Sequence, residues 1–223
     1  MILSSELTTL LQSNGGRIID NVSKQAIEDY KYIREHLNDG DIRENAELQE
    51  RIGQFYYFKK HRITKKMRAH FIDVLEEQKP KEEGAEVQFI ETVDKFLGPE
   101  NRNDYKEKHF MLLSQLLHLL DDKYTTYNKH MGELMHFALP TGQLIGNYQK
   151  RTAFLDFYEK LNELKESFLE NESVSNLLKV IRIKNSAFKD VLTLQKRMDL
   201  LFGSASDLFG KGELLRTQSP LKA

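Results

Sequence analysis

Cysteine and tryptophan are absent from the 223 residues, and proline occurs only four times. Without cysteine the chain has no disulfide scaffold, no thiolate zinc site, no iron–sulfur cluster and no cysteine nucleophile. An excess of charge of one sign is also absent, because 33 Lys and Arg residues balance 34 Asp and Glu residues. This balance removes the global basic charge that is typical of many nucleic-acid-binding proteins, but it is compatible with a local basic patch.

Long hydrophobic runs are missing as well. The longest apolar-rich stretch, residues 110–120, is interrupted by Ser114, Gln115 and His118, and no stretch reaches the roughly 18 apolar residues that span a bilayer. The N-terminal residues contain no basic region followed by an apolar core and a small-residue cleavage site, as a secretory signal would. These absences predict a cytoplasmic protein without a membrane partner.

Apolar residues recur at steps of three and four along most of the chain, which is typical of amphipathic helices. No alternating pattern is long enough to predict a sheet. We therefore expect an all-α, multi-helix protein with a helical N-terminal region over residues 1–78 and a polar linker over 79–85. A bundle of about four longer helices follows over residues 86–203, and then an extended C-terminal tail over 204–223. Pro80 and Gly84, set among charged residues, mark the linker.

The predicted helices cover residues 6–12, 22–37, 42–56, 64–75, 87–97, 104–120, 144–168 and 173–203. The first is expected to stop at Gly15-Gly16. The sixth is expected to open with Asp104 as its cap and to run through Leu120, with a continuation as far as Leu139 as the alternative. Thr64 and Ser173 are the expected N-caps of two others. Leucine surrounds the helix over residues 112–120 on most sides, so this helix is predicted to be the buried centre, with His118 as a hydrogen-bonded core histidine.

A basic segment is the strongest local asymmetry of charge. Six Lys and Arg residues fall within ten positions, directly after the aromatic run 55–58. Cations neutralise phosphate and aromatic rings stack on unpaired bases, so the segment predicts a nucleic-acid or anion site. The alternative is a solvated turn. In that case its neighbours Phe55, Tyr56 and Phe58 belong to the core, and its charges pair with acidic stretches such as Glu76-Glu77 and Glu82-Glu83. The candidate residues are Lys59, Lys60, Arg62, Lys65, Lys66 and Arg68.

A second pattern combines Arg102, Asn103 and His109 near the expected start of a helix. It resembles the R-x4-6-H motif of the HEPN family of all-helical ribonucleases. The resemblance covers eight residues and implies a dimeric, metal-independent enzyme that uses the RNA 2′-hydroxyl as nucleophile. In such an enzyme Arg102 would stabilise phosphate charge and His109 would transfer a proton. A solvated helix start, with Asp104 as cap, is the alternative.

Other chemistry has little support in the sequence. Glu133 and His136 match one half of the di-iron motif of four-helix bundles, but no second Glu-x-x-His completes it. Phosphate-binding loops, dinucleotide fingerprints and the α/β-hydrolase nucleophile motif are absent. No metal and no cofactor is therefore predicted.

The leading hypothesis is a non-enzymatic all-helical interaction or structural subunit of a protein assembly, with a protein partner or self-association. The first alternative is the HEPN-like ribonuclease. The second is a nucleic-acid-binding adaptor that uses the basic segment to hold RNA or another polyanion.

Overall fold

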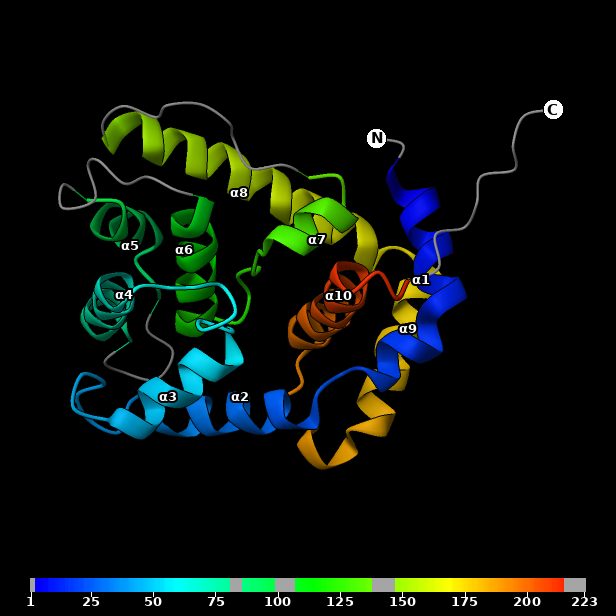
Figure 1. Cartoon of the computed structure of the whole chain (residues 1–223), viewed down its shortest axis with the longest axis horizontal. Coiled ribbons are helices and arrows are strands. Elements are labelled where there is room, and N and C mark those ends of the chain that lie inside the picture. The colour runs from blue at the N-terminus through cyan, green and yellow to red at the C-terminus, as the bar shows by residue number, and fades with distance from the viewer. Residues whose placement is uncertain (1–2, 81–85, 99–106, 138–146, 215–223) are drawn as a thin grey trace. The chain divides into compact units, whose positions relative to one another are not determined.

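The computed structural model describes residues 3–80, 86–98, 107–137 and 147–214, and in these ranges every regular element is helical, as predicted. The elements are α1 (Leu3–Asp20), α2 (Lys24–His36), α3 (Ala46–Phe55), α4 (Lys65–Gln78), α5 (Phe89–Phe96), α6 (Glu107–Leu120), α7 (Lys129–Leu134), α8 (Asn147–Leu169), α9 (Glu172–Lys184), the short 3-10 helix η2 (Ser186–Phe188) and α10 (Leu194–Gly210) (Figure 1). Within the described ranges, no helix has the length and apolar character needed to cross a membrane.

The described residues form two compact units. Unit 1 contains residues 3–23, 128–137 and 161–214, and unit 2 contains residues 24–80, 86–98, 107–127 and 147–160. Helix α8 contributes its first part to unit 2 and its last part to unit 1. The units follow other boundaries than the predicted regions, because α4 on one side of the expected linker packs with α5 and α6 on the other.

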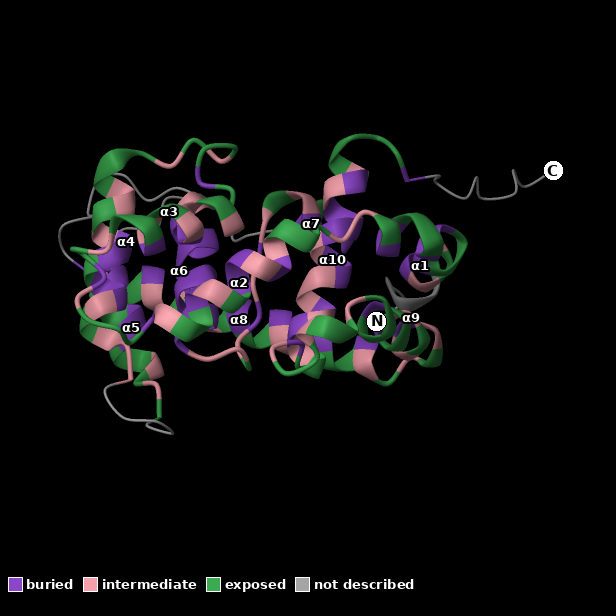
Figure 2. Cartoon of the chain, turned by 90° about the horizontal axis from the view of Figure 1, so that it is seen from below, coloured by how far each residue is buried: buried purple, intermediate pink, exposed green. Residues whose placement is uncertain are grey.

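Helix α6 is the centre of unit 2, as its leucine pattern predicts. All residues from 109 to 120 are buried, and Figure 2 shows most of the α6 ribbon in the colour of buried residues. Its Phe110 ring contacts Phe154 of α8 edge-on, with 5.1 Å between ring centroids. His118 is fully buried, and a hydrogen bond of 2.7 Å joins its Nδ1 to the Tyr56 hydroxyl, which confirms the expected core histidine.

Helix α6 ends at Leu120, which is the nearer of the two expected ends, so the alternative continuation to Leu139 is wrong. The Asp121 carboxylate accepts a hydrogen bond from the backbone N–H of Lys123, which stabilises a turn at this point. The N–H of Tyr127 then donates to the hydroxyl of Ser114, and Asn128 caps the separate helix α7. The expected cap, Asp104, lies outside the described residues.

Helix α1 of unit 1 runs through the Gly15-Gly16 pair, where the sequence predicts a stop. Leu11 and Ile18 are fully buried on either side of the pair, and their burial outweighs the low helix propensity of glycine. Gly15 has a packing role, since a Cβ atom there would lie 2.6 Å from Cδ2 of Leu177 on α9. A Cβ atom at Gly16 would meet nothing within 4 Å.

The two glycines give a matched pair of stability variants. Gly16→Ala is expected to raise the free energy of unfolding by about 0.5–1 kcal/mol, because alanine favours the helix and has open space there. Gly15→Ala should raise the free energy of unfolding by clearly less, since its Cβ must displace the Leu177 side chain. Urea denaturation of both variants measures the difference, and equal gains would contradict the close approach of α9 to α1.

The single helix predicted over 173–203 is two helices, α9 and α10. Asn171 rather than Ser173 caps α9, with its side chain accepting from the N–H groups of Ser173 and Val174. The helix ends at Lys184, and Thr193 caps α10 by accepting from the N–H of Lys196. The side chain of Asn185 donates to the carbonyl of Ile181 at 2.9 Å where α9 ends. Polar side chains at Asn185 and Thr193 therefore divide the periodic pattern, because they offer the backbone an alternative to the helix ladder.

Helix α10 continues beyond Gly203 to Gly210, so the predicted tail at 204–223 begins too early. Ala205 and Leu208 are buried at 0% and 4% exposure, and this burial stabilises the additional turns. The Ser204 hydroxyl donates to the carbonyl of Ile18 on α1 at 2.5 Å. Residues 215–223 of the predicted tail lie outside the described residues.

Candidate nucleic-acid interface

The basic segment lies in the connection between α3 and α4 of unit 2, and its first half is a helix-ending turn. Helix α3 closes with a Schellman motif, in which the N–H of Phe58 donates to the carbonyl of Gly53 at 2.9 Å and that of Tyr57 to Gln54 at 3.1 Å. Tyr57 has a φ of 53°, in the left-handed region. Glycine is the usual residue at this position because it has no Cβ to clash.

A second turn of the same kind follows at once. The N–H of Ile63 donates to the carbonyl of Phe58 at 2.9 Å, that of Arg62 donates to Lys59 at 3.0 Å, and Arg62 has a φ of 52°. Thr64 then accepts from the N–H of Met67, which confirms it as the N-cap of α4. We refer to residues 56–68 as the Tyr57 loop.

The chain itself provides a comparison for these two turns. Helix α10 also ends in a Schellman motif, and there the left-handed position is Gly212, with a φ of 72°. Helix α7 has His136 at the equivalent position. The Tyr57 loop thus has side chains at two positions where glycine would fit with less strain.

Three consecutive aromatic residues of the Tyr57 loop alternate between the core and the solvent. Tyr56 is buried, and its hydroxyl is hydrogen-bonded to His118. Phe58 is also buried, and its ring contacts that of Phe71 edge-on, with 5.3 Å between the ring centroids. Tyr57, between them, is 52% exposed, and Nζ of Lys60 lies 5.7 Å from its ring centroid. Of the three aromatic residues expected in the core, Tyr56 and Phe58 are buried and Phe55 is partly buried, whereas Tyr57 faces the solvent.

The cations of the Tyr57 loop are held at the surface. Arg68 is partly buried, with its guanidinium close to Gly53, and the other five predicted anion-binding residues are exposed. Lys108 of α6 adds a further cation, since its Nζ donates to the carbonyl of Arg62 at 3.1 Å. The described residues supply no ion-pairing carboxylate to Lys59, Arg62, Lys65 or Lys66.

The acidic residues that the sequence offers as partners are engaged elsewhere. Glu76 pairs with Lys79 at 2.8 Å, and Glu77 pairs with Lys95 at 3.2 Å. Glu82 and Glu83 lie outside the described residues. Within the described part of unit 2, the Tyr57 loop is therefore a cationic surface without neutralising carboxylates at four of its side chains.

The candidate ribonuclease residues are placed only in part. His109 lies on α6 and is 4% exposed, whereas Arg102 and Asn103 lie outside the described residues. The catalytic arrangement of Arg102 with His109 therefore stays a prediction. Among the described residues, no group of three or more His, Asp or Glu side chains is arranged to hold a metal ion.

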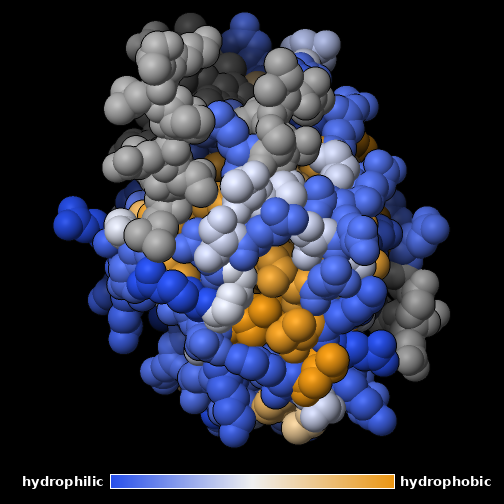
Figure 3. Space-filling view, turned by 90° about the vertical axis from the view of Figure 1, so that its right-hand side faces the viewer, coloured by the Kyte–Doolittle hydropathy of each residue, from blue (hydrophilic) through white to orange (hydrophobic). Residues whose placement is uncertain are grey.

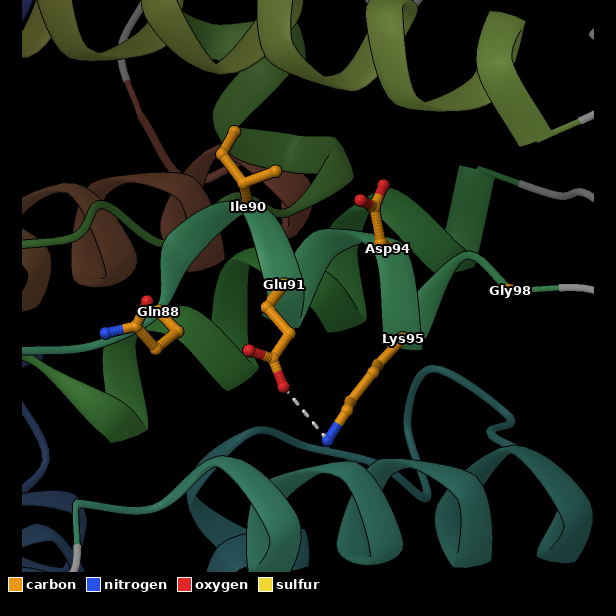
Figure 4. Close-up of a pocket in the computed structure, with 6 residues that line it drawn as sticks. All are labelled: Gln88, Ile90, Glu91, Asp94, Lys95 and Gly98. Carbon is orange, nitrogen blue, oxygen red and sulfur yellow. Dashed lines mark ion pairs between the residues drawn. The ribbon is translucent and has the colours of Figure 1, made fainter.

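An open hollow of about 630 Å³ lies on α5 (Figure 4). Ile90 and Asp94 point from one side of the helix, and Glu91 and Lys95 from the other, where they form an ion pair of 3.2 Å. A hydrogen bond from Gln78, together with Lys95, lowers the pKa of Glu91. A carboxylate held in its charged form by such partners is a surface ion-pair group and a poor proton donor.

Comparisons of the chain with protein-family models, with curated proteins and with solved structures find no match. The structure defines the chain as an all-helical protein, and a fold alone does not indicate a function. The Tyr57 loop, with its exposed ring and its cations, is the feature of the described residues from which a function can be inferred.

Proposed function

We propose that the chain is a non-enzymatic helical binding protein that holds single-stranded RNA on the Tyr57 loop. The observation that supports this function is the identity of the two left-handed residues, Tyr57 and Arg62, both of which are exposed. Tyrosine rings and arginine guanidinium groups are the planar side chains that stack on unpaired bases.

The cost of the loop conformation supports the same function. A left-handed backbone at a residue with a Cβ costs of order 1 kcal/mol, and such strain persists where the surrounding structure holds it. Here the buried side chains of Tyr56 and Phe58 anchor the loop in the core of unit 2. A binding role for the two exposed side chains would explain why this strain is retained, because glycine would form both turns with less strain.

The chemistry of the surface favours a single strand over a duplex. The cations of the loop can neutralise phosphates, and the Tyr57 ring can stack on a base whose face is accessible. In a duplex the base faces are covered by their neighbours in the stack.

Self-association or a protein partner is the other part of the hypothesis from the sequence. Light scattering on the same sample measures self-association.

The salt dependence of RNA binding tests the proposal. In the triple variant Lys59→Gln, Lys65→Gln and Lys66→Gln, the slope of log affinity against log salt concentration is expected to fall by about 2, since each phosphate contact on a single strand contributes about 0.7. Fluorescence anisotropy with a labelled single-stranded oligoribonucleotide at several salt concentrations gives the slope.

A matched control removes three exposed lysines elsewhere, Lys24, Lys31 and Lys129, and changes the net charge by the same amount. The proposal requires this control to keep the wild-type slope, and equal losses in both triple variants would refute it. Gel analysis of the same RNA with EDTA present tests the ribonuclease alternative, because cleavage that disappears in His109→Ala would identify an enzyme.

A further inference from the structure

Helix α9 of unit 1 carries apolar side chains on two of its faces. Val174, Leu178 and Ile181 are buried and form the face that packs within the unit. Val180 and Ile183 lie on another face and are 37% and 73% exposed. The packing of unit 1 therefore leaves apolar surface of α9 in water, and its burial against a partner would be favourable.

Exposed apolar side chains are concentrated in this part of the chain. Among the described residues, six large apolar side chains are exposed, and three of them fall within positions 180–194: Val180, Ile183 and Leu194. Figure 3 shows apolar side chains gathered on the face where α1 and α9 lie, with hydrophilic side chains around them. Apolar surface with a polar rim is typical of interaction sites.

An open hollow of about 410 Å³ lies between α9, η2 and α10 and includes Ile183 in its lining. Arg197 lines it from α10, and Leu194 precedes Arg197 by three residues, so both lie on the same side of that helix. The exposed apolar residues of both helices therefore border one hollow. We refer to it as the α9–α10 hollow.

The surface of the α9–α10 hollow is almost entirely apolar, although four of its six lining residues are cations. Lysine and arginine explain this combination, because their hydrocarbon stems cover apolar surface while their charged ends stay in water. The hollow thus has an apolar floor and cations around it. The lining consists of Lys179, Arg182, Ile183, Ser186, Lys189 and Arg197.

The charge around the hollow is positive and is not balanced locally. Residues 179–197 contain six Lys and Arg residues and a single carboxylate, although the whole chain has a net charge of −1. Among the described residues, Arg182 and Lys189 form no ion pair. Lys184, on the same helix but outside the lining, pairs with Asp20. The cations at the hollow are therefore available to the carboxylates of a partner.

We propose that the α9–α10 hollow binds an acidic amphipathic helix of a partner protein. The apolar floor receives the apolar stripe of that helix, as in other grooves that hold a helix. The surrounding cations attract the carboxylates beside the stripe, and this complementarity steers association. A second copy of this chain fits less well, because a symmetric contact would bring the cations of the two copies together. Nucleic acid phosphates supply the charge but no apolar stripe.

Three labelled peptides of about 18 residues, long enough to form a helix, test the proposal by fluorescence anisotropy with the full chain. The first has leucine at i, i+3, i+4 and i+7 spacing and glutamate on its other faces. The second has lysine in place of glutamate, and the third has serine in place of leucine. The leucine–glutamate peptide is expected to bind at least about tenfold more tightly than either of the others, because it alone combines the apolar stripe with negative charge.

Two variants locate the binding. Ile183→Ser is expected to weaken the binding of the leucine–glutamate peptide about tenfold or more, the effect of losing one buried aliphatic side chain. Arg182→Gln should weaken it about twofold to fivefold, as for an exposed ion pair. Both side chains are exposed, so both variants should fold as the wild type does. Ile90→Ser, at an exposed isoleucine of unit 2, and Lys129→Gln, at an exposed lysine of unit 1, are the matched controls and should bind as the wild type does.

The proposal is overturned if the leucine–glutamate peptide does not bind, if the lysine peptide binds equally well, or if Ile183→Ser binds no more weakly than Ile90→Ser. Two other outcomes would replace it. Sedimentation with phosphatidic acid vesicles that is lost in Ile183→Ser, without peptide binding, would identify a membrane surface. A dimer in light scattering that is lost in Ile183→Ser would identify a second copy. The peptide experiment contains no RNA and these variants leave the Tyr57 loop unchanged, so its result is separate from that of the proposed RNA binding.

Discussion

Tyr57→Gly is expected to weaken the binding of single-stranded RNA by roughly tenfold to a hundredfold, the contribution of one base stacked on an aromatic ring. The same substitution should leave the free energy of unfolding unchanged or raise it by up to about 1 kcal/mol. The ring is half exposed, and glycine adopts the φ of 53° at this position without a Cβ clash. A variant that loses binding without losing stability separates function from folding.

Two neighbouring substitutions serve as controls for this experiment. Tyr57→Phe retains the ring and should bind RNA nearly as the wild type does. Tyr56→Phe removes the hydroxyl that is hydrogen-bonded to His118, and is expected to lower the free energy of unfolding by about 1–3 kcal/mol. Anisotropy and urea denaturation of the same preparations measure both quantities. Wild-type affinity in Tyr57→Gly would exclude the ring as a binding group.

Asp199→Ala is expected to lower the free energy of unfolding by about 3–5 kcal/mol, the usual loss when one partner of a buried ion pair is removed. Nζ of Lys165 on α8 lies 3.5 Å from Oδ1 of Asp199 on α10, and both side chains are only 7% exposed. Without Asp199, the ammonium group of Lys165 stays buried without this carboxylate. The melting temperature should fall by roughly 10 °C for a chain of this size.

The double variant Lys165→Met with Asp199→Leu removes both charges and should recover most of the lost stability, because packed apolar side chains can replace a buried pair. Glu28→Ala breaks the exposed pair between Lys24 and Glu28 and should change the free energy of unfolding by less than about 1 kcal/mol. Thermal and urea unfolding of the three variants give the comparison. A double variant as unstable as Asp199→Ala would show that the buried charge is not the cause.

Much of the helical architecture follows from the spacing of apolar residues. The leucines of α6 predict its burial, because a helix that is apolar on most sides has to be surrounded by others. The helix boundaries were less predictable where tertiary contacts oppose local preferences. Gly15-Gly16 predicts a stop in the sequence, but tertiary packing such as the approach of Leu177 keeps α1 helical there. The break between α9 and α10 depends on the C-cap Asn185 and the N-cap Thr193.

The candidate site was predictable in composition but not in geometry. Six cations in ten positions identify the basic segment, whereas the outward orientation of Tyr57 depends on a left-handed turn at a residue that rarely adopts one. Lys165 and Lys196 are buried, and nothing in their sequence context distinguishes them from exposed lysines.

The composition of unit 1 from distant chain segments has a consequence for synthesis on the ribosome. Asn21, just after α1, donates a hydrogen bond to Ser204 on α10, and these residues are 183 positions apart. At a synthesis rate of about 5–20 residues per second, Asn21 is synthesised roughly 10–40 s before Ser204. During that time the apolar residues Leu11 and Ile18 of α1 lack the packing that buries them in the finished protein. Helix α1 therefore exposes apolar side chains on the nascent chain until α9 and α10, the helices on which it packs, have been synthesised.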